Sequence, residues 1–138
     1  MALDPRQIDL IQDSFQKIRA NLQPPSAFFY EALFRHAPQY REMFREDLEG
    51  QGMRFMSTLG VIVDNLGQPE AVEARFADLG VSHAALGITR AHFPPMEEAL
   101  IDTLRNELGA GMTEETEAAW RAAYEEVAAR IMAKGNIS

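Results

Sequence analysis

The stretch DLGVSHAALGITRAHF, residues 78–93, decides the fold prediction because it sets one histidine, His83, on an apolar helix face. Apolar side chains recur on either side of His83 at steps of three and four residues: Val72, Phe76, Leu79 and Leu86. Such steps follow one face of an α-helix. An imidazole on that face needs a partner for its ring nitrogens. What His83 binds is therefore the central question about this chain.

Two interpretations of His83 are open at this point. A histidine on an apolar helix face is most often a hydrogen-bonded core residue, and the alternative is a ligand to a metal. Gly80 precedes His83 by one turn and Gly87 follows it, so little side-chain bulk surrounds the imidazole. The residue alone favours the core interpretation, and other parts of the chain must support a ligand.

The composition is that of an ordinary globular chain, with 138 residues, 46% of them hydrophobic and 25% charged. We expect a single domain over residues 1–138. The apolar runs are too short to cross a bilayer, and the N-terminus lacks a basic-then-apolar signal pattern. We therefore expect a cytoplasmic protein without a membrane span.

Charge and cysteine content exclude several classes of function. The net charge of −8 argues against nucleic acid as a partner, because domains that bind it are usually basic. The chain has no cysteine, which excludes disulfides, thiolate metal sites and iron–sulfur clusters. With three histidines and no thiol, any metal chemistry must use few protein ligands or a prosthetic group.

Helical periodicity runs along the whole chain, and no alternation typical of strands appears. The patterns predict helices over residues 5–22, 26–37, 39–44, 51–66, 69–87 and 90–108, and a last helix that Thr113 caps and that ends near Lys134. The predicted fold class is all-α, with about seven helices and no internal repeat.

Prolines and capping residues set the predicted helix ends. Asp4 caps the first helix and Pro5 takes its first position. This helix is expected to end before the proline pair at 24–25, with Ser26 capping the second helix. At the second proline pair, 94–95, either a helix begins or the first turn of a longer helix is broken.

Two further polar side chains lie on apolar helix faces. Tyr30 shares a face with Leu33 and Phe34, so we expect its ring to be buried. A buried phenol needs a hydrogen-bond partner, and the simplest one is a backbone carbonyl. Gln51 precedes Phe55 by four residues, so its amide either ends in solvent at the helix start or points into a cavity.

Tyr30, Gln51 and His83 thus place three unusual polar groups on three predicted helices. A helical bundle with a plain core has little reason to bury all three. A prosthetic group that carries a metal and a polar ligand explains them together. The histidine would then hold the metal from one side, and the phenol and the amide would face a bound ligand on the other.

Four blocks of sequence support this hypothesis by their order and spacing: FFYEALFRHAPQYREMF (28–44), QGMRFMSTLGVIVDNL (51–66), SHAALGI (82–88) and AAWRAAY (118–124). With these blocks the chain resembles the globin family from about residue 3 to residue 132. It is most similar to bacterial single-domain globins, which are akin to the haem domain of flavohaemoglobins. This resemblance favours the ligand interpretation of His83.

The resemblance implies a globin fold around non-covalent haem b, with His83 as the proximal ligand of the iron. Tyr30 and Gln51 match the distal tyrosine and glutamine that face a bound gas, and they are the catalytic candidates. Arg54 matches a basic position that reaches a haem propionate, although a solvated surface arginine explains it equally well. The other haem contacts implied by the resemblance are Phe44, Phe55, Ile88, Phe93, Met96 and Leu100.

The other two histidines do not match the ligand position: His36 can cap carbonyls at a helix end, and His92 lies near the start of the following helix. The chain also departs from flavohaemoglobins in two places. It has Phe93 where they carry a tyrosine, and it lacks their glutamate near the end of the last helix. We therefore expect His83 to rely on a backbone carbonyl, which makes it a less strongly donating ligand.

The resemblance implies reversible binding of O₂, NO and CO, with tight O₂ binding and slow release. The first hypothesis for function is nitric oxide detoxification by dioxygenation to nitrate. These 138 residues carry no flavin and nicotinamide domain, so such an enzyme would depend on a separate reductase. The alternatives are O₂ storage or delivery and gas sensing. Peroxidase activity lacks a distal acid–base histidine. We expect a monomer or a homodimer.

Overall fold

The computed structural model describes residues 3–43 and 48–138. In this part of the chain there is no strand, and the all-α prediction is confirmed. The α-helices are α1 (Pro5–Arg19), α2 (Gln23–His36), α3 (Leu48–Asp64), α4 (Glu73–Ala85), α5 (Phe93–Leu108) and α6 (Glu114–Gly135). The 3-10 helices are η1 (Pro38–Met43), η2 (Pro69–Val72), η3 (Arg90–His92) and η4 (Gly109–Gly111).

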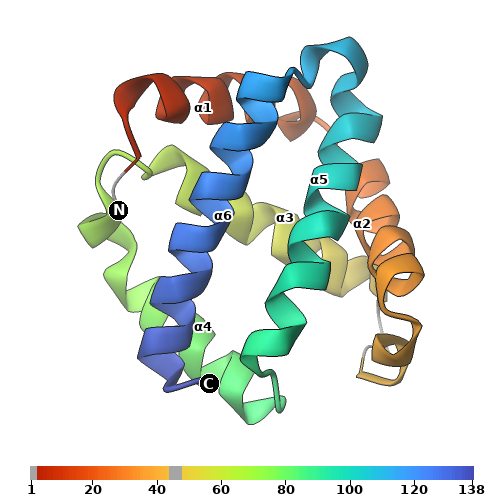
Figure 1. Ribbon diagram of the computed structural model, residues 1–138, viewed down its shortest axis with the longest axis vertical. Helices are drawn as coiled ribbons and strands as arrows, with labels where there is room; N and C mark the ends of the chain where they lie inside the picture. Colours follow the sequence, from red (N-terminus) through yellow and green to blue (C-terminus); the bar gives the residue numbers. More distant parts are fainter. Residues whose placement is uncertain (1–2, 44–47) are drawn as a thin grey trace.

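The helices cross one another around α5 and α6, which run along the long axis of the molecule (Figure 1). α2 packs mainly against α5 and α3, whereas α4 packs against α6. α1 crosses one end of α6, and α3 passes behind α5 and α6 in the view of Figure 1. The helix that carries His83 is thus held mainly by the C-terminal helix. Among the described helices, none combines the length and apolarity that a bilayer crossing requires.

The start of α1 follows the prediction, and the helix ends before the proline pair at 24–25 as expected, at Arg19 instead of residue 22. The Asp4 carboxylate accepts a hydrogen bond from the Gln7 backbone N–H at 2.8 Å, and the Gln7 side chain accepts one from the Asp4 N–H at 3.0 Å. The prolines at 24–25 lie inside the first turn of α2, where a missing N–H costs nothing. Ser26 is therefore no cap, and its hydroxyl donates to the Leu22 carbonyl at 2.5 Å.

The other boundaries shift for similar reasons. The prolines at 94–95 lie in the first turn of α5, which begins at Phe93, while η3 forms a separate turn before it. The segment predicted as one helix over 69–87 divides into η2 and α4. Gly87, predicted to end the helix, follows α4 with a φ of 79°, a backbone conformation that favours glycine.

The buried apolar side chains form two clusters. The first cluster lies between α1, α2, α3, α5 and the N-terminal half of α6, and it includes Phe15, Leu33 and Trp120. The Trp120 Nε1–H donates to the Ser14 hydroxyl at 2.9 Å, which satisfies the indole inside the core. The second cluster lies between the end of α3, α4 and the C-terminal half of α6.

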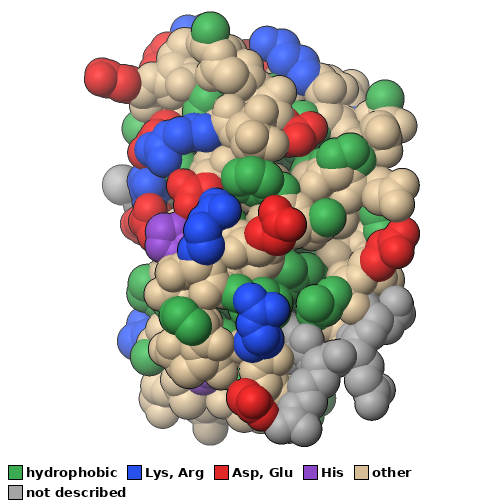
Figure 2. Space-filling view, turned by 90° about the vertical axis from the view of Figure 1, so that its right-hand side faces the viewer, with side chains coloured by type: hydrophobic (Ala, Val, Ile, Leu, Met, Phe, Trp, Pro, Cys, Tyr) green, Lys and Arg blue, Asp and Glu red, His purple; other side chains and the backbone are tan. Residues whose placement is uncertain are grey.

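Figure 2 shows that acidic and basic side chains are intermixed with small apolar patches on one outer face.

One prediction about the apolar faces is wrong. Leu86 was expected on the same stripe as His83, but its side chain is 65% exposed. The reason is that α4 ends at Ala85, so helical periodicity no longer directs Leu86. On α3, Met56 and Val63 are fully buried, and Phe55 is half-buried against the first cluster.

Candidate functional site

The imidazole of His83 lies in the last turn of α4 and is half-buried. Its Nδ1 lies 2.6 Å from the carbonyl oxygen of Leu79, one turn earlier on the same helix. A carbonyl oxygen only accepts, so Nδ1 carries the proton and Nε2 of the neutral ring keeps its lone pair. No group in residues 3–43 or 48–138 bonds Nε2. This is the tautomer that a histidine needs in order to bind a metal through Nε2.

The ring of Phe93 faces the His83 ring in a nearly parallel arrangement, with centroids 6.1 Å apart and an interplanar angle of 18°. Phe93 itself is buried, at 6% exposure. Its backbone carbonyl accepts a hydrogen bond from the Tyr124 hydroxyl at 2.9 Å. Burial and the charge of Glu97 both raise the pKa of Tyr124, so this phenol stays a donor. Tyr124 therefore anchors the start of α5, and with it the ring beside His83.

The backbone also fixes the position of α4. A Cβ atom added to Gly80 would lie 2.8 Å from the Ile131 carbonyl oxygen and closer still to the Gly135 nitrogen. Real Cβ atoms do not approach backbone this closely, so Gly80 allows α4 and α6 to touch. Sequence reasoning expected Gly80 to leave space beside His83, whereas the glycine faces α6. At the start of α4, Glu73 pairs with Lys134 at 2.5 Å.

Tyr30 lies on α2 within the first cluster and is 7% exposed, as predicted from its helical face. Its ring meets Phe29 edge-on, with centroids 5.2 Å apart, and lies 6.0 Å from Phe34. Burial raises the pKa of Tyr30 to about 12, and the positive charge of Arg54 opposes this shift. The phenol is therefore protonated at neutral pH and able to donate a hydrogen bond. Tyr30 also borders a cavity of about 320 Å³ between α2, η1 and α3.

Three of the predicted site residues lie on α3. Gln51 is half-buried one turn into the helix, so it is neither fully solvated nor enclosed. Phe55 stacks on Phe29 of α2, with ring centroids 4.3 Å apart and an angle of 18°. Arg54 is exposed, and its charge acts on Tyr30. The structure therefore gives α3 a fixed aromatic contact and two polar side chains that reach the molecular surface.

The remaining predicted haem contacts fall into two groups. Ile88 and Phe93 belong to the second cluster, and the Ile88 N–H donates to the His83 carbonyl oxygen at 3.0 Å. Leu100 is buried in the first cluster, with Met96 half-buried against it. α5 joins the two groups, since Phe93 is its first residue. Phe44 lies outside the described residues, so its predicted place beside the haem stays a prediction.

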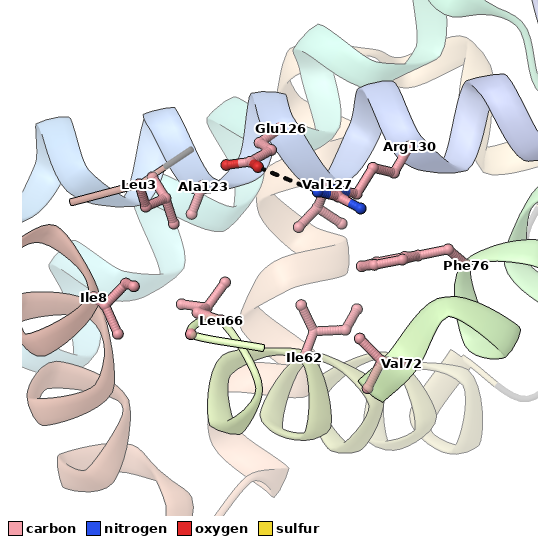
Figure 3. A pocket seen from close by; sticks show the side chains of 11 residues that line it. Leu3, Ile8, Ile62, Leu66, Val72, Phe76, Ala123, Glu126, Val127 and Arg130 are labelled. Atoms are coloured by element: carbon pink, nitrogen blue, oxygen red, sulfur yellow. Dashed lines mark ion pairs between the residues drawn. The ribbon is translucent and has the colours of Figure 1, made fainter. Parts of the chain in front are cut away.

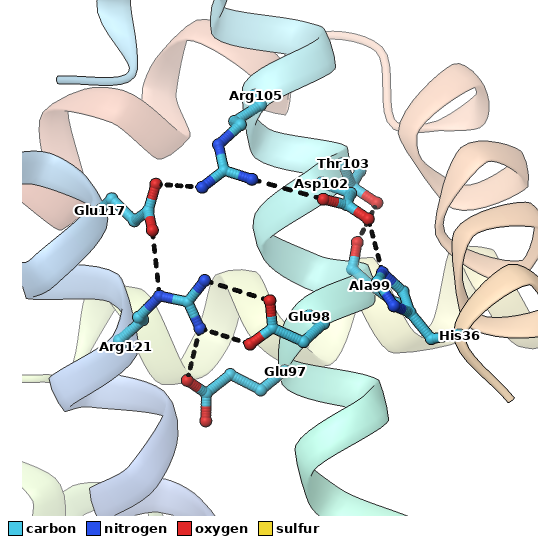
Figure 4. Close-up of polar contacts among 9 residues, drawn as sticks. All are labelled: His36, Glu97, Glu98, Ala99, Asp102, Thr103, Arg105, Glu117 and Arg121. Carbon is cyan, nitrogen blue, oxygen red and sulfur yellow. Dashed lines mark hydrogen bonds and ion pairs between the residues drawn. The ribbon is translucent and has the colours of Figure 1, made fainter. Parts of the chain in front are cut away.

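The other histidines have partners of their own. His36 was expected to cap carbonyls, but its Nε2 lies 2.7 Å from the Asp102 carboxylate. His36 thereby joins a network of charged side chains that connects three helices (Figure 4). The network comprises His36 of α2, Glu97, Glu98, Asp102 and Arg105 of α5, and Glu117 and Arg121 of α6. Nδ1 of His92 accepts from the Thr89 N–H at 2.9 Å.

Some of these features had no signal in the sequence. The Tyr124 hydrogen bond and the contact between Gly80 and Gly135 join residues far apart in the chain. Tyr124 lies on the apolar stripe of the last helix, which predicts that its ring is buried but does not predict which group its hydroxyl bonds.

Among the described residues, no group of three or more His, Cys, Asp or Glu side chains could hold a metal ion.

The chain is similar to known proteins over most of its length. The globin family model matches residues 27–131. A leghemoglobin of Psophocarpus tetragonolobus is 29% identical, over 91% of this chain and 93% of its own length. Leghemoglobin-1 of Lupinus luteus is 27% identical, over 88% of each chain.

A solved structure is similar over nearly the whole fold. It is the engineered carbene transferase RmaNOD, a candidate nitric oxide dioxygenase from Rhodothermus marinus. The TM-score is 0.89 at 27% identity, and the match covers 98% of this chain and 94% of that one. Globins bind haem and, through its iron, diatomic gases. On the match of the family model to most of its length, this chain belongs to the globin family.

Proposed function

We propose that this globin binds haem b non-covalently through Nε2 of His83 and uses it to hold O₂ and other diatomic gases. We further propose that its activity is the dioxygenation of nitric oxide to nitrate, with electrons from a separate reductase. One observation carries the proposal: the 2.6 Å contact between His83 Nδ1 and the Leu79 carbonyl oxygen. This contact leaves the other ring nitrogen as the candidate ligand.

The residues on the His83 side fit haem. Haem iron takes its in-plane ligands from the porphyrin and needs a single histidine from the protein, which His83 offers in the required tautomer. The flat ring of Phe93 and the buried side chain of Ile88 supply apolar surface next to this histidine. Ferrous haem, when bound, supplies the open iron position at which O₂, NO or CO is taken up.

The partner of His83 favours gas binding over O–O bond cleavage. Cleavage is promoted by a strongly electron-donating proximal ligand, such as a thiolate, and a carboxylate partner likewise raises the basicity of a histidine. His83 has a neutral carbonyl instead. This supports the expectation, made from Phe93 and the missing glutamate, that His83 relies on the backbone.

Tyr30 is the proposed hydrogen-bond donor on the distal side. Its phenol is buried and stays protonated well above neutral pH, so it can donate to the partly negative outer atom of bound O₂. A neutral hydrogen bond contributes about 0.5–1.5 kcal/mol, and about 1.4 kcal/mol corresponds to tenfold in a dissociation constant. Exclusion of water strengthens such a bond. Gln51 is proposed as a second donor.

Slow release of O₂ suits dioxygenation, because O₂ must stay in place until nitric oxide arrives. The similarity to a candidate nitric oxide dioxygenase from Rhodothermus marinus supports this choice. The leghemoglobin relatives support the second candidate function, storage or delivery of O₂ without turnover. Both candidates use the same proposed haem site, and they differ in whether a reductase partner exists.

Two measurements, made one after the other, test the proposal. Absorption spectra of the purified protein, ferric and then reduced with dithionite under CO, should show a Soret band that shifts at each step. The ferrous protein with O₂, NADPH and a general flavin reductase should then consume nitric oxide over many turnovers and release nitrate. A single turnover would favour storage or delivery. A protein that stays colourless with excess haem would refute both candidates.

A further inference from the structure

Two large apolar side chains, Val81 and Leu86, are exposed, and both lie within three residues of His83. Each has an exposed fraction of 65%, and no other Val, Leu, Ile, Met, Phe or Trp side chain in residues 3–43 and 48–138 is exposed. Ser82, the alanines at 84–85 and Gly87 are exposed as well. We refer to these six exposed residues of the segment 81–87 as the apolar edge.

The apolar edge lies on a different side of α4 from the residues that pack the helix. On the packed side, Phe76 points into the space between α4, Ile62 of α3 and Val127 of α6 (Figure 3). Val81 precedes His83 by two positions, so the two side chains project about 160° apart around the helix axis. A haem held by His83 would therefore leave Val81 exposed. Neither helix packing nor the proposed haem site accounts for this surface.

The charged groups around the apolar edge include two unpaired cations. No Asp, Glu, Lys or Arg occurs from residue 79 to residue 89, although 25% of the whole chain is charged. Arg75 and Asp78 precede this stretch and Arg90 follows it, and none of the three forms an ion pair with another described residue. In contrast, Arg130 of α6 pairs with Glu126 at 3.6 Å (Figure 3). The two arginines and one aspartate leave a local excess of one positive charge on a chain of net charge −8.

The size of the apolar edge favours a transient partner over a second copy of this chain. The segment has seven residues, whereas each side of a stable interface of standard size uses about 20–30 residues. Exposed apolar groups with a polar rim mark surfaces for protein partners, and complexes between redox proteins have the smallest interfaces. A redox partner is also the one that the proposed function needs.

We propose that the apolar edge is the docking surface for a flavin-containing reductase that presents the apolar edge of its flavin ring. Carboxylates on the rim of that partner would meet Arg75 and Arg90. The inference rests on the proposed function, because it names the place where electrons enter. Electron transfer slows steeply with distance, and the apolar edge begins two residues before the candidate iron ligand and ends four residues after it.

The electrons balance over two haem groups. A reduced nicotinamide gives the flavin one hydride, which carries two electrons. The reduced flavin then passes one electron to each of two ferric irons and releases one proton. The reductase therefore needs to dock, transfer and leave twice for each nicotinamide that it oxidises, which suits a small interface.

The rate at which the ferric protein becomes ferrous, under CO and without O₂, tests the docking. The reductant is the separated flavin and nicotinamide domain of a flavohaemoglobin with NADH and no free flavin, and stopped flow follows the Soret shift. Leu86→Glu and Val81→Glu should each slow this reduction about 10-fold, because they place an unpaired charge in an apolar contact. Leu86→Met keeps the apolar surface and should keep the rate.

Two controls separate docking from folding and from haem chemistry. Dithionite is small and needs no docking surface, so it should reduce the natural sequence and both glutamate variants at equal rates. Ala110→Glu adds the same charge in η4, at the opposite end of the long axis from the end of α4 (Figure 1), and should keep the rate with the reductase domain. Since Val81 and Leu86 are exposed, their variants should keep the Soret band and its shift with CO.

The unpaired arginines give an independent readout. Arg90→Glu should slow reduction by the reductase domain about 3- to 10-fold, because it turns an attraction into a repulsion at the rim. For the same reason the rate of the natural sequence should fall as salt is added. A rate that responds neither to this variant nor to salt would overturn the assignment of the arginines to the interface.

Four results would overturn the docking surface. They are equal rates in the natural sequence and both glutamate variants, no reduction of the natural sequence by the reductase domain, an equal slowing with dithionite, and a dimer that Leu86→Glu converts to monomers. Size-exclusion chromatography with light scattering measures the last, which would assign the apolar edge to a second copy of this chain. A protein that takes up no haem would refute the proposed function instead, so the two failures are distinguishable.

Discussion

The two sides of the candidate haem site are held by different parts of the polypeptide. On the His83 side the constraints act through the backbone: Nδ1 bonds the Leu79 carbonyl, and Gly80 brings α4 onto the backbone of α6. On the Tyr30 side they act through side chains, with Tyr30 packed on Phe29 and Phe34. Side-chain substitutions nearby should therefore change the position of the His83 ring little. Substitutions beside Tyr30 should change the surroundings of the bound gas more.

The largest expected effect is on the His83 side itself. Because the loss of a mere hydrogen-bond partner of a ligand costs about 10–100-fold in metal affinity, His83→Ala should lower haem affinity by more than about 100-fold. Transfer of haem to an excess of an acceptor globin measures this change. His92→Ala is the matched control, since His92 has local partners, and it should keep the affinity. Stoichiometric haem uptake with an unchanged spectrum in His83→Ala would refute the ligand assignment.

The next effect tests the backbone contact between α4 and α6. Gly80→Ala places a carbon against the Ile131 carbonyl, so the free energy of unfolding should fall by about 1–3 kcal/mol. Urea denaturation at fixed haem saturation measures it. Gly67→Ala is the control, because a Cβ atom there would meet nothing within 4 Å. Equal stability of the two variants would show that α4 is free to move away from α6.

Alkaline pH should reveal the burial of Tyr30. An exposed phenol ionises near pH 10, whereas burial raises the pKa of Tyr30 to about 12. Between these values the unfolded chain loses the proton first, so the stabilising effect is complete below pH 10 and is lost as the pH rises towards 12.

The expected loss is about 1–2 kcal/mol, after allowance for partial solvent access. Tyr124 acts in the same direction, so the quantity to measure is the difference between the natural sequence and Tyr30→Phe in urea denaturation from pH 9 to 12. Parallel pH profiles for the two proteins would show that Tyr30 is solvated in the folded state.

The smallest effect in free energy concerns the gas itself. Tyr30→Phe removes one neutral donor, so O₂ dissociation should become about 3- to 10-fold faster. Stopped-flow mixing of the O₂ complex with CO measures the rate. Tyr40→Phe is the control, because the Tyr40 hydroxyl approaches the Ala91 carbonyl at 3.4 Å. An unchanged rate in Tyr30→Phe would leave Gln51 as the donor to examine.

Helix positions were predictable from sequence because burial repeats with the helical period. The same period predicted the buried ring of Tyr30, and the Asp4-Pro5 pair correctly marked the start of α1. Proline was misleading at 24–25, because a proline pair is equally compatible with a break and with a first helical turn. The prediction that Leu86 lies on the apolar stripe was wrong because helical periodicity no longer applies beyond the end of α4.

Helical periodicity could not predict the contacts between helices that hold the site. Periodicity tells which side of a helix is buried and leaves open which helix covers it. Gly80 and Gly135 are far apart in sequence, so their contact follows only from the crossing of α4 and α6. The acceptor of the Tyr124 proton is likewise a carbonyl at the start of another helix.

The seam between Gly80 and Gly135 also has a mechanical consequence. At this one point no side chain separates the backbones of α4 and α6, so a displacement of one helix there acts directly on the other. Ser138 extends this linkage, because its carbonyl accepts a hydrogen bond from the Arg90 N–H at 3.3 Å, just beyond the loop that follows α4. A displacement of the His83 imidazole would therefore be transmitted to the residues that follow α6.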